Sequence, residues 1–204
     1  MDIKSIKPRL KVFLEFTIEN SICLGKVIIE LFEDSTPLTC YNFLRMIKKS
    51  NNALQRYIGS SIFKIKRGYY LQMGDITHEN GLGGISSFGS KFREENFYHQ
   101  FNDSYRVAMT NTGMGSTQSQ FFITLCSAPW LNNNFVVFGR VVDGFNILDK
   151  ISLMDVDEFG EPKTAIIVSD SGIYKDKRED EGIQETNDNE SFKSVIEEEE
   201  LLNS

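Results

Sequence analysis

The chain has 204 residues, which suits one domain followed by a tail, and 40% of its residues are apolar, enough to bury a core. Its net charge of −7 is concentrated in residues 175–204, which hold four basic and eleven acidic residues and leave 18 of each sign before them. Because the first 174 residues carry no excess of positive charge, we expect neither nucleic acid nor an anionic membrane as a partner. We place the domain at residues 8–174 and predict that the acidic tail, residues 175–204, is disordered.

Cysteine and histidine usage limits the compartment and the chemistry. The three cysteines, Cys23, Cys40 and Cys126, are odd in number and lack a CxxC spacing, which is typical of reduced core thiols. The N-terminal residues lack an uninterrupted apolar segment, and no stretch reaches the length of a membrane span. We therefore expect a non-secreted, cytoplasmic monomer, with the nucleus as the alternative location. With only two histidines, His78 and His99, no metal-ligand cluster is apparent, and no cofactor is expected.

The first third of the chain favours strands and one helix. Residues 10–18 and 25–31 are predicted strands whose short link suits a hairpin. A helix should begin with Thr36 as N-cap and Pro37 at the first helical position, and Lys48 and Lys49 suit its C-terminal end. Its predicted apolar face consists of Cys40, Phe43, Leu44 and Ile47.

The middle of the chain alternates between strands and loops. Residues 61–66 and 69–73 are predicted strands, and the glycine-rich span 74–103 is predicted to be an ordered functional loop because it lacks periodicity. Residues 107–141 are predicted to form two strands that flank a loop carrying Trp130. Many short strands of this kind favour a closed antiparallel barrel.

The segment from Gln118 to Leu125 alternates in an unusual way. It places Phe122 on one face and Phe121 and Ile123 on the other, so both faces carry large apolar groups. Such a strand belongs in a barrel wall with a covered outer face, or beside a ligand groove. A core with satisfied polar groups is the competing interpretation for each single residue. After this segment, residues 144–151 should form a short helix and residues 165–168 a final strand.

Several motifs occur in a fixed order between Tyr57 and Val141. They are YIGSS at 57–61, QMGD at 72–75, NGLGG at 80–84, KFREENF at 91–97, MTN at 109–111, SQFFI at 119–123, WL at 130–131 and VVFG at 136–139. Together they closely resemble the cyclophilin family of peptidyl-prolyl isomerases, without a gap over this region and less tightly over residues 11–172. The resemblance implies a mainly β fold, a closed eight-stranded antiparallel barrel capped by two α-helices, with a proline-binding groove on its outer face.

The resemblance also implies an activity, cis-trans isomerisation of X-Pro bonds in protein segments, which assists protein folding. Rotation about such a bond must overcome about 18–20 kcal/mol of amide resonance, and a donor placed near the proline nitrogen stabilises the twisted state preferentially. In the family an Arg supplies this donor, and the matching residue here is Lys64. Because Lys keeps the charge but lacks the planar fork, we expect a rate that is lower by roughly 10- to 100-fold.

The remaining site residues follow from the same resemblance. Lys64, Gln72, Asn111 and Phe122 are assigned to catalysis. Residues assigned to substrate binding are Tyr69, Tyr70, Thr110, Thr112, Gln120, Trp130, Leu131 and Phe135.

Several of these positions depart from the family pattern. Tyr70 and Phe135 stand where the family usually has Met and His, and Thr110 and Thr112 stand where it commonly has Ala. Trp130 matches the position associated with cyclosporin, so cyclosporin-type macrocycles are candidate ligands besides proline-containing peptides; a buried core Trp is the competing interpretation. Two other functions remain open, a non-catalytic prolyl-peptide binding module and a scaffold within a protein complex.

Overall fold

The computed structural model describes residues 8–19, 22–47 and 56–175. Most of the predicted tail and the two lysines expected at the end of the first helix, Lys48 and Lys49, lie outside the described residues. The disorder of the tail therefore stays a prediction.

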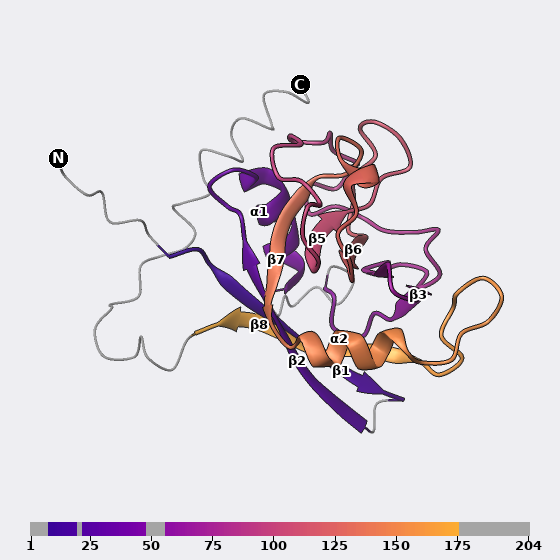
Figure 1. The fold of residues 1–204 in the computed structure, drawn as a ribbon. Coiled ribbons are helices and arrows are strands. Elements are labelled where there is room, and N and C mark those ends of the chain that lie inside the picture. The colour runs from indigo at the N-terminus through magenta and orange to yellow at the C-terminus, as the bar shows by residue number, and fades with distance from the viewer. Residues whose placement is uncertain (1–7, 20–21, 48–55, 176–204) are drawn as a thin grey trace.

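Eight strands form a single antiparallel sheet that curves into a barrel (Figure 1). They are β1 (Lys11–Ile18), β2 (Ile22–Leu31), β3 (Ile62–Lys66), β4 (Tyr70–Met73), β5 (Arg106–Met109), β6 (Phe121–Thr124), β7 (Val137–Asp143) and β8 (Ile166–Tyr174). Their order in the sheet is β3-β4-β6-β5-β7-β2-β1-β8.

The two edge strands of this sheet meet along a short seam. Ser61 forms a bridge with Ile167, and the Val168 N–H donates to the Ser60 carbonyl oxygen at 2.9 Å. In a second hydrogen bond, the Gly59 N–H donates to the Val168 carbonyl oxygen at 2.9 Å. The seam brings the sheet close to full closure, and the predicted eight-stranded antiparallel barrel is confirmed.

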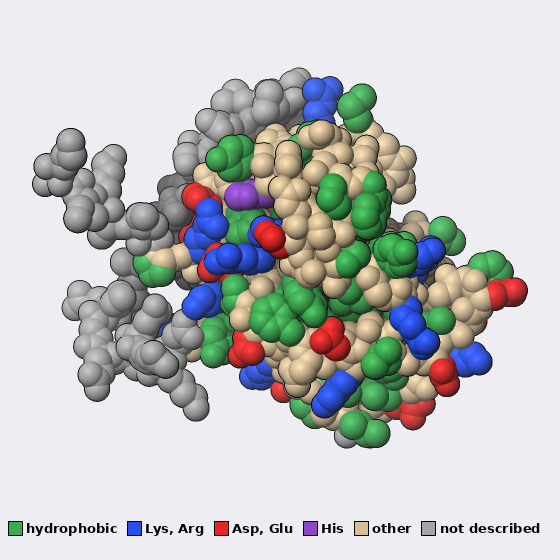
Figure 2. All heavy atoms as spheres, in the orientation of Figure 1, with side chains coloured by type: hydrophobic (Ala, Val, Ile, Leu, Met, Phe, Trp, Pro, Cys, Tyr) green, Lys and Arg blue, Asp and Glu red, His purple; other side chains and the backbone are tan. Residues whose placement is uncertain are grey.

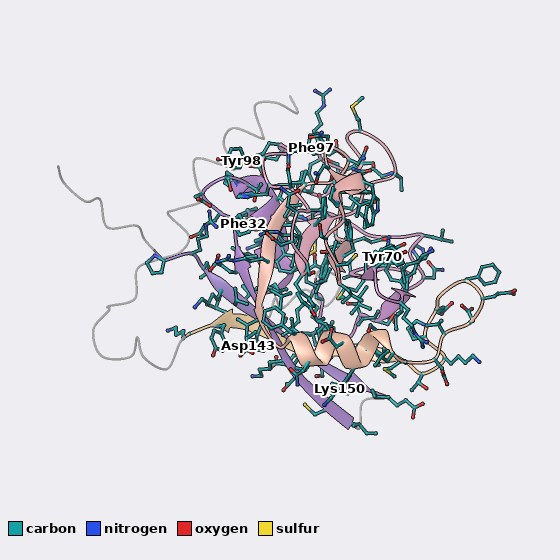
Figure 3. The ribbon with its side chains drawn as sticks, viewed as in Figure 1. Phe32, Tyr70, Phe97, Tyr98, Asp143 and Lys150 are labelled. Carbon is teal, nitrogen blue, oxygen red and sulfur yellow. The ribbon has the colours of Figure 1, made fainter. Side chains whose placement is uncertain are left out.

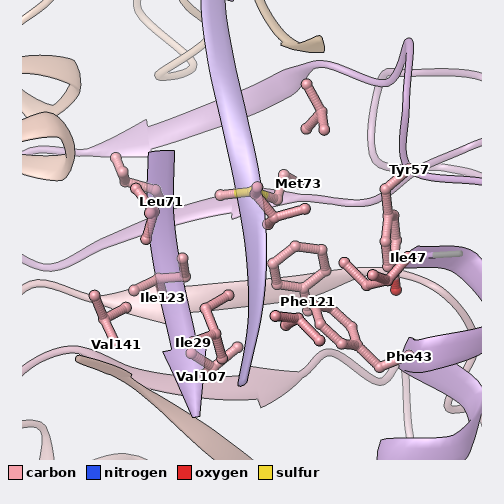
Figure 4. Packing of buried hydrophobic residues seen from close by; sticks show 14 of the residues in the cluster. Ile29, Phe43, Ile47, Tyr57, Leu71, Met73, Val107, Phe121, Ile123 and Val141 are labelled. Atoms are coloured by element: carbon pink, nitrogen blue, oxygen red, sulfur yellow. The ribbon is translucent and has the colours of Figure 1, made fainter. Parts of the chain in front are cut away.

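Two helices complete the barrel, α1 (Pro37–Ile47) and α2 (Phe145–Ser152), with a short 3-10 helix η1 (Pro129–Leu131) before β7. Both α-helices contribute apolar side chains to the barrel interior, including Phe43 and Ile47 from α1 and Leu148 and Ile151 from α2. Figure 4 shows Phe43 and Ile47 beside Phe121 of β6 within this interior cluster. The rings of Phe43 and Phe121 meet edge to face with centroids 5.1 Å apart.

The prediction that the three cysteines are core thiols holds for Cys40, which is buried, but is wrong for Cys23, which is exposed, and for Cys126, which is partly exposed.

Some predicted boundaries were also wrong. The segment 107–141 holds parts of three strands rather than two, because β5 pairs with both β6 and β7. The last strand runs to Tyr174, well beyond Val168, because β8 pairs with β1 along its whole length. Only four residues of the predicted strand 118–125 are in β6, and all four are buried.

Helix α1 begins where the sequence predicts but is capped differently. The Thr36 carbonyl oxygen accepts the Cys40 N–H at 3.0 Å, whereas the Thr36 hydroxyl donates backwards to the carbonyl oxygen of Phe32. The carboxylate of Glu95 instead accepts the N–H groups of Leu38 and Thr39, each at 3.0 Å. A distant residue therefore supplies the acceptor that the first turn needs, and Thr36 was wrongly assigned as the capping side chain.

The long loop after β4 is organised around one buried carboxylate, that of Asp75, which has no exposed surface. Its two oxygens accept six hydrogen bonds, from the Thr77 hydroxyl and from the backbone N–H groups of Thr77, His78, Asn80, Gly81 and Gly83. Burial alone would raise the pKa of this carboxyl, but hydrogen bonds from His78, Gly83 and Thr77 to the ionised form outweigh burial and lower it. The predicted ordered loop thus has a charged centre.

Within the described part of the chain, no helix is long and apolar enough to span a bilayer. The same residues contain no group of three His, Cys, Asp or Glu side chains placed to hold a metal ion.

We predict that acid destabilises the protein partly through Asp75. Because its folded-state pKa lies below the usual value of about 3.9, its stabilisation is present above that value and is lost as the pH falls towards the folded-state pKa. Melting temperatures measured from about pH 5 downward should fall for the natural protein. The Asp75→Asn variant should melt lower at neutral pH and lose less on acidification, whereas parallel curves for the two proteins would contradict this assignment.

We further predict that a chain ending at Tyr174 folds like the 204-residue chain. The acidic tail has few apolar residues with which to make packed contacts. Calorimetry of the two proteins should give closely similar melting temperatures, and a drop of many degrees would show that the domain extends into the tail.

Candidate functional site

A row of directly paired residues crosses five neighbouring strands. Lys64 of β3 faces Gln72 of β4, Gln72 faces Phe122 of β6, Phe122 faces Ala108 of β5, and Ala108 faces Val137 of β7. Directly opposite residues in an antiparallel pair point to the same face of the sheet. The residues next to these in each strand have side chains that pack in the barrel interior. Because successive residues of a strand point to opposite faces, the row itself lies on the outer face.

The apolar part of the row belongs to a second hydrophobic cluster, which we name the outer cluster. Its buried members are Phe32, Phe101, Ala108, Phe122, Ala128 and Val137, and its partly buried members are Tyr70, Leu131 and Phe135. In the view of Figure 3, Phe32 lies to the left of β5 and β6 and Tyr70 lies to their right. Figure 2 shows, on the face seen in Figure 1, apolar side chains interspersed with Lys, Arg, Asp and Glu side chains.

Phe122 lies at the centre of the outer cluster and is 4% exposed. Phe101 stacks on it at 5.8 Å between centroids, while Phe135 and Tyr70 meet it edge to face at 5.2 and 5.9 Å. Aromatic rings in these arrangements hold one another in place. The result is an apolar surface whose partly open side is formed by Tyr70, Leu131 and Phe135.

Polar side chains border this surface in a connected chain. The Gln72 Nε2 donates to the Gln120 Oε1 at 3.1 Å, and the Gln120 Nε2 donates to the carbonyl oxygens of Gly81 and Gly83 at 3.0 and 2.7 Å. The Thr110 hydroxyl donates to the Gln120 carbonyl oxygen at 3.2 Å. Two facing side-chain amides are thereby fixed beside the apolar surface.

Asn111 and Thr112 lie at the far end of the site. The Asn111 Nδ2 donates to the Asn134 carbonyl oxygen at 2.9 Å, which ties it to the residue before Phe135. Thr112 is exposed, and its N–H donates to the Ser116 hydroxyl within a turn. The structure thus brings Asn111 to the site but places Thr112 on a neighbouring loop.

Lys64 is half-buried on β3, and the turn that contains Gly160 lies against the same strand. The Ile65 N–H donates to the Gly160 carbonyl oxygen at 2.7 Å, and Gly160 lies close to the Lys64 stem. Among the described residues, no carboxylate forms an ion pair with Lys64. Its charge is consequently available to a ligand on the outer face.

Two aromatic side chains form an exposed rim. Trp130 on η1 is 61% exposed and Tyr69 is 50% exposed, and their rings meet edge to face at 6.3 Å. The interpretation of Trp130 as a core residue is therefore wrong. Both rings are in a position to contact a bound molecule.

Some residues of the site were not found from the sequence. Ala108 and Val137 form its floor, and because their neighbours along β5 and β7 are buried as well, no polar-apolar alternation marks them in the sequence. Phe101 lies in a loop without periodicity, so no local pattern marks it.

Comparisons with known proteins show which family the chain resembles. The family model for the cyclophilin type peptidyl-prolyl cis-trans isomerase matches residues 13–173. The chain is 34% identical over 174 residues to peptidyl-prolyl cis-trans isomerase 9 of Caenorhabditis elegans, covering 82% of this chain and 56% of that protein. It is 34% identical over 149 residues to peptidyl-prolyl cis-trans isomerase D of Saccharomyces cerevisiae, covering 73% of this chain and 66% of that protein.

A third relative, peptidyl-prolyl cis-trans isomerase cyp11 of Rhizopus delemar, is 35% identical over 173 residues, which cover 82% of this chain and 50% of that protein. The chain spans about half the length of several of these curated relatives. The family match covers most of the described barrel, including every strand of the outer-face row. This chain belongs to the cyclophilin-type peptidyl-prolyl cis-trans isomerase family.

Proposed function

We propose that this chain catalyses cis-trans isomerisation of X-Pro bonds in protein segments and thereby assists protein folding. The observation that carries the proposal is the outer-face row, in which Lys64 and Gln72 stand beside Phe122 in direct cross-strand register. A cation, an amide and an apolar seat are the groups that such a reaction needs, and they lie side by side on adjacent strands.

The apolar seat would hold the proline ring. Phe122 presents its ring among Tyr70 and Phe135, and Leu131 packs against the same cluster. Burying an apolar ring on this surface is favourable by about 25 cal/mol for each Å² removed from water. Holding the ring still while the preceding residue turns makes the X-Pro bond the axis of rotation.

The polar groups would act on the amide. As the bond twists, conjugation is lost and a lone pair localises on the proline nitrogen, so a donor aimed there stabilises the twisted state more than the planar one. Lys64 is two strands away from Phe122, a separation of roughly 10 Å across the sheet, and its flexible stem can lean across Gln72 towards the seat. Gln72 would bind the backbone of the substrate.

We also propose ligands and a setting for the protein. The ligands are proline-containing segments, and the exposed rim of Trp130 and Tyr69 supports cyclosporin-type macrocycles as further ligands. The catalytic roles of Lys64, Gln72, Asn111 and Phe122 belong to this proposal, as do a monomeric state and a cytoplasmic or nuclear location.

The Phe122→Ala variant should lose both peptide binding and isomerisation. It removes the ring at the centre of the seat, where Phe-to-Ala changes cost about 3–5 kcal/mol, so folding must be verified by circular dichroism. Binding and exchange of short X-Pro peptides would be measured beside Phe159→Ala, a control in which the same substitution falls on a ring that is 76% exposed. Unchanged peptide affinity in folded Phe122→Ala would place the groove elsewhere.

The Lys64→Arg variant should raise turnover by about tenfold or more, equivalent to roughly 1.4 kcal/mol of transition-state stabilisation, because the planar fork gives a better directed donor. Peptide affinity should change much less, since the added contact acts mainly in the twisted state. Lys64→Ala should lower the rate further in a folded protein. The matched control is Lys150→Arg on α2 (Figure 3), which should leave the rate unchanged.

The same series decides between the enzyme and a binding module. If Lys64→Arg leaves the rate flat while the natural protein binds X-Pro peptides, the groove is a recognition site without useful turnover. Two residues favour this second function: Lys64, in place of the Arg usual in the family, and Phe135, in place of the usual His.

A further inference from the structure

We propose that Asp75 is a positioning residue for the groove, because its carboxylate orders the turn of residues 76–84 whose carbonyl groups hold Gln120, and Gln120 in turn holds Gln72. The inference rests on the proposed function, since it assigns a role to a residue that does not itself touch the substrate.

The first step is the way in which the carboxylate is held. Asp75 is fully buried, and among the described residues it has no cationic partner. One oxygen accepts the N–H groups of Thr77 and His78, and the other accepts those of Gly81 and Gly83, both at 2.9 Å. A buried negative charge that is satisfied by backbone donors fixes the path of the backbone that supplies them.

The second step is steric. A Cβ atom on Gly83 would lie 2.0 Å from the Thr77 Oγ1 and 2.6 Å from the Asp75 Oδ1. A Cβ atom on Gly81 would lie 2.7 Å from the ring of Phe63, and Gly81 has a φ of +85°. The turn is therefore held between the carboxylate on one side and the Phe63 ring on the other, with no room for a side chain at either glycine.

The third step is the set of hydrogen bonds that connects this turn, through Gln120, to Gln72 in the groove. Both acceptors of the Gln120 Nε2 group are carbonyl oxygens of this turn, those of Gly81 and Gly83. With both amide hydrogens engaged, the Gln120 Oε1 is directed to the Gln72 Nε2, which donates to it at 3.1 Å. Gln72 lies in the outer-face row between Lys64 and Phe122. The orientation of a groove amide thus depends on a carboxylate three contacts away.

The Asp75→Asn variant tests this chain of contacts with little change in size. An Asn amide can accept through its oxygen only, so its NH₂ group would face backbone N–H donors that the second carboxylate oxygen accepts in the natural protein. The turn must then shift, and the carbonyl oxygens of Gly81 and Gly83 would leave the Gln120 Nε2.

Two measurements follow for the 204-residue chain. In ¹H–¹⁵N spectra without any peptide, the side-chain amide resonances of Gln120 and Gln72 should move towards the positions of free amides in Asp75→Asn. In X-Pro exchange assays, kcat/KM should fall by roughly ten- to a hundredfold at a temperature where the variant is folded, because small misplacements of substrate-binding groups have effects of this size.

The control variant is Glu95→Gln, which weakens the cap of α1 and therefore stability without touching Gln120 or Gln72. Its Gln120 and Gln72 resonances should stay in place, and its kcat/KM should stay within about twofold of the natural value. If Asp75→Asn does not fold, Thr77→Val replaces it. That change removes one donor to Asp75 and the acceptor of the Gly84 N–H, and it should move the same resonances.

Unmoved Gln120 and Gln72 resonances in a folded variant would overturn the positioning role. An equal loss of kcat/KM in Asp75→Asn and Glu95→Gln would overturn it as well, because the effect would then follow stability alone. If the natural protein proves inactive, the proposed function fails, whereas the amide resonances still decide the role of Asp75.

Discussion

The pairing register of β6 with its neighbours is the constraint on which the rest of the structure depends. Phe121 and Phe122 are adjacent in the chain and point to opposite faces, so Phe121 packs in the barrel interior and Phe122 in the outer cluster. If the pairing register of β6 slipped by one residue, Phe121 and Phe122 would exchange faces. The polar side chains of the outer face would then turn into the barrel interior. The rings that surround each of them, Phe43 on one face and Phe101 and Phe135 on the other, hold the register from both sides.

The local sequence pattern predicted that the strand around Phe122 is apolar on both faces. The alternation around Phe122 indicated a strand with two apolar faces, and all four residues of β6 are buried. Short strands and the start of α1 were also predictable, since they depend on residues close together in the chain. Family resemblance added the residues that we propose for the groove, and the structure brings most of them to one face.

What could not be predicted depends on contacts between distant residues. Glu95 caps a helix that begins more than fifty residues earlier, and no local pattern marks it as an acceptor for Leu38 and Thr39. Asp75 is one carboxylate among 29 acidic residues in the sequence, and only the folded turn shows that it collects backbone donors. Strand β5, with four residues, is too short to have a clear period and is defined by its two partners.

The turn around Gly160 has a consequence for solubility. Strand β3, which carries Lys64, is at the end of the sheet order, and an edge strand with open N–H groups is a template on which another chain can pair. The Gly160 carbonyl oxygen occupies the Ile65 N–H at 2.7 Å, and its backbone comes so close that a Cβ atom would lie 3.0 Å from the Ile65 carbonyl oxygen. The turn thus shields the middle of an otherwise open edge, so that β3 carries the cation of Lys64 on its outer face without offering its side to a second molecule.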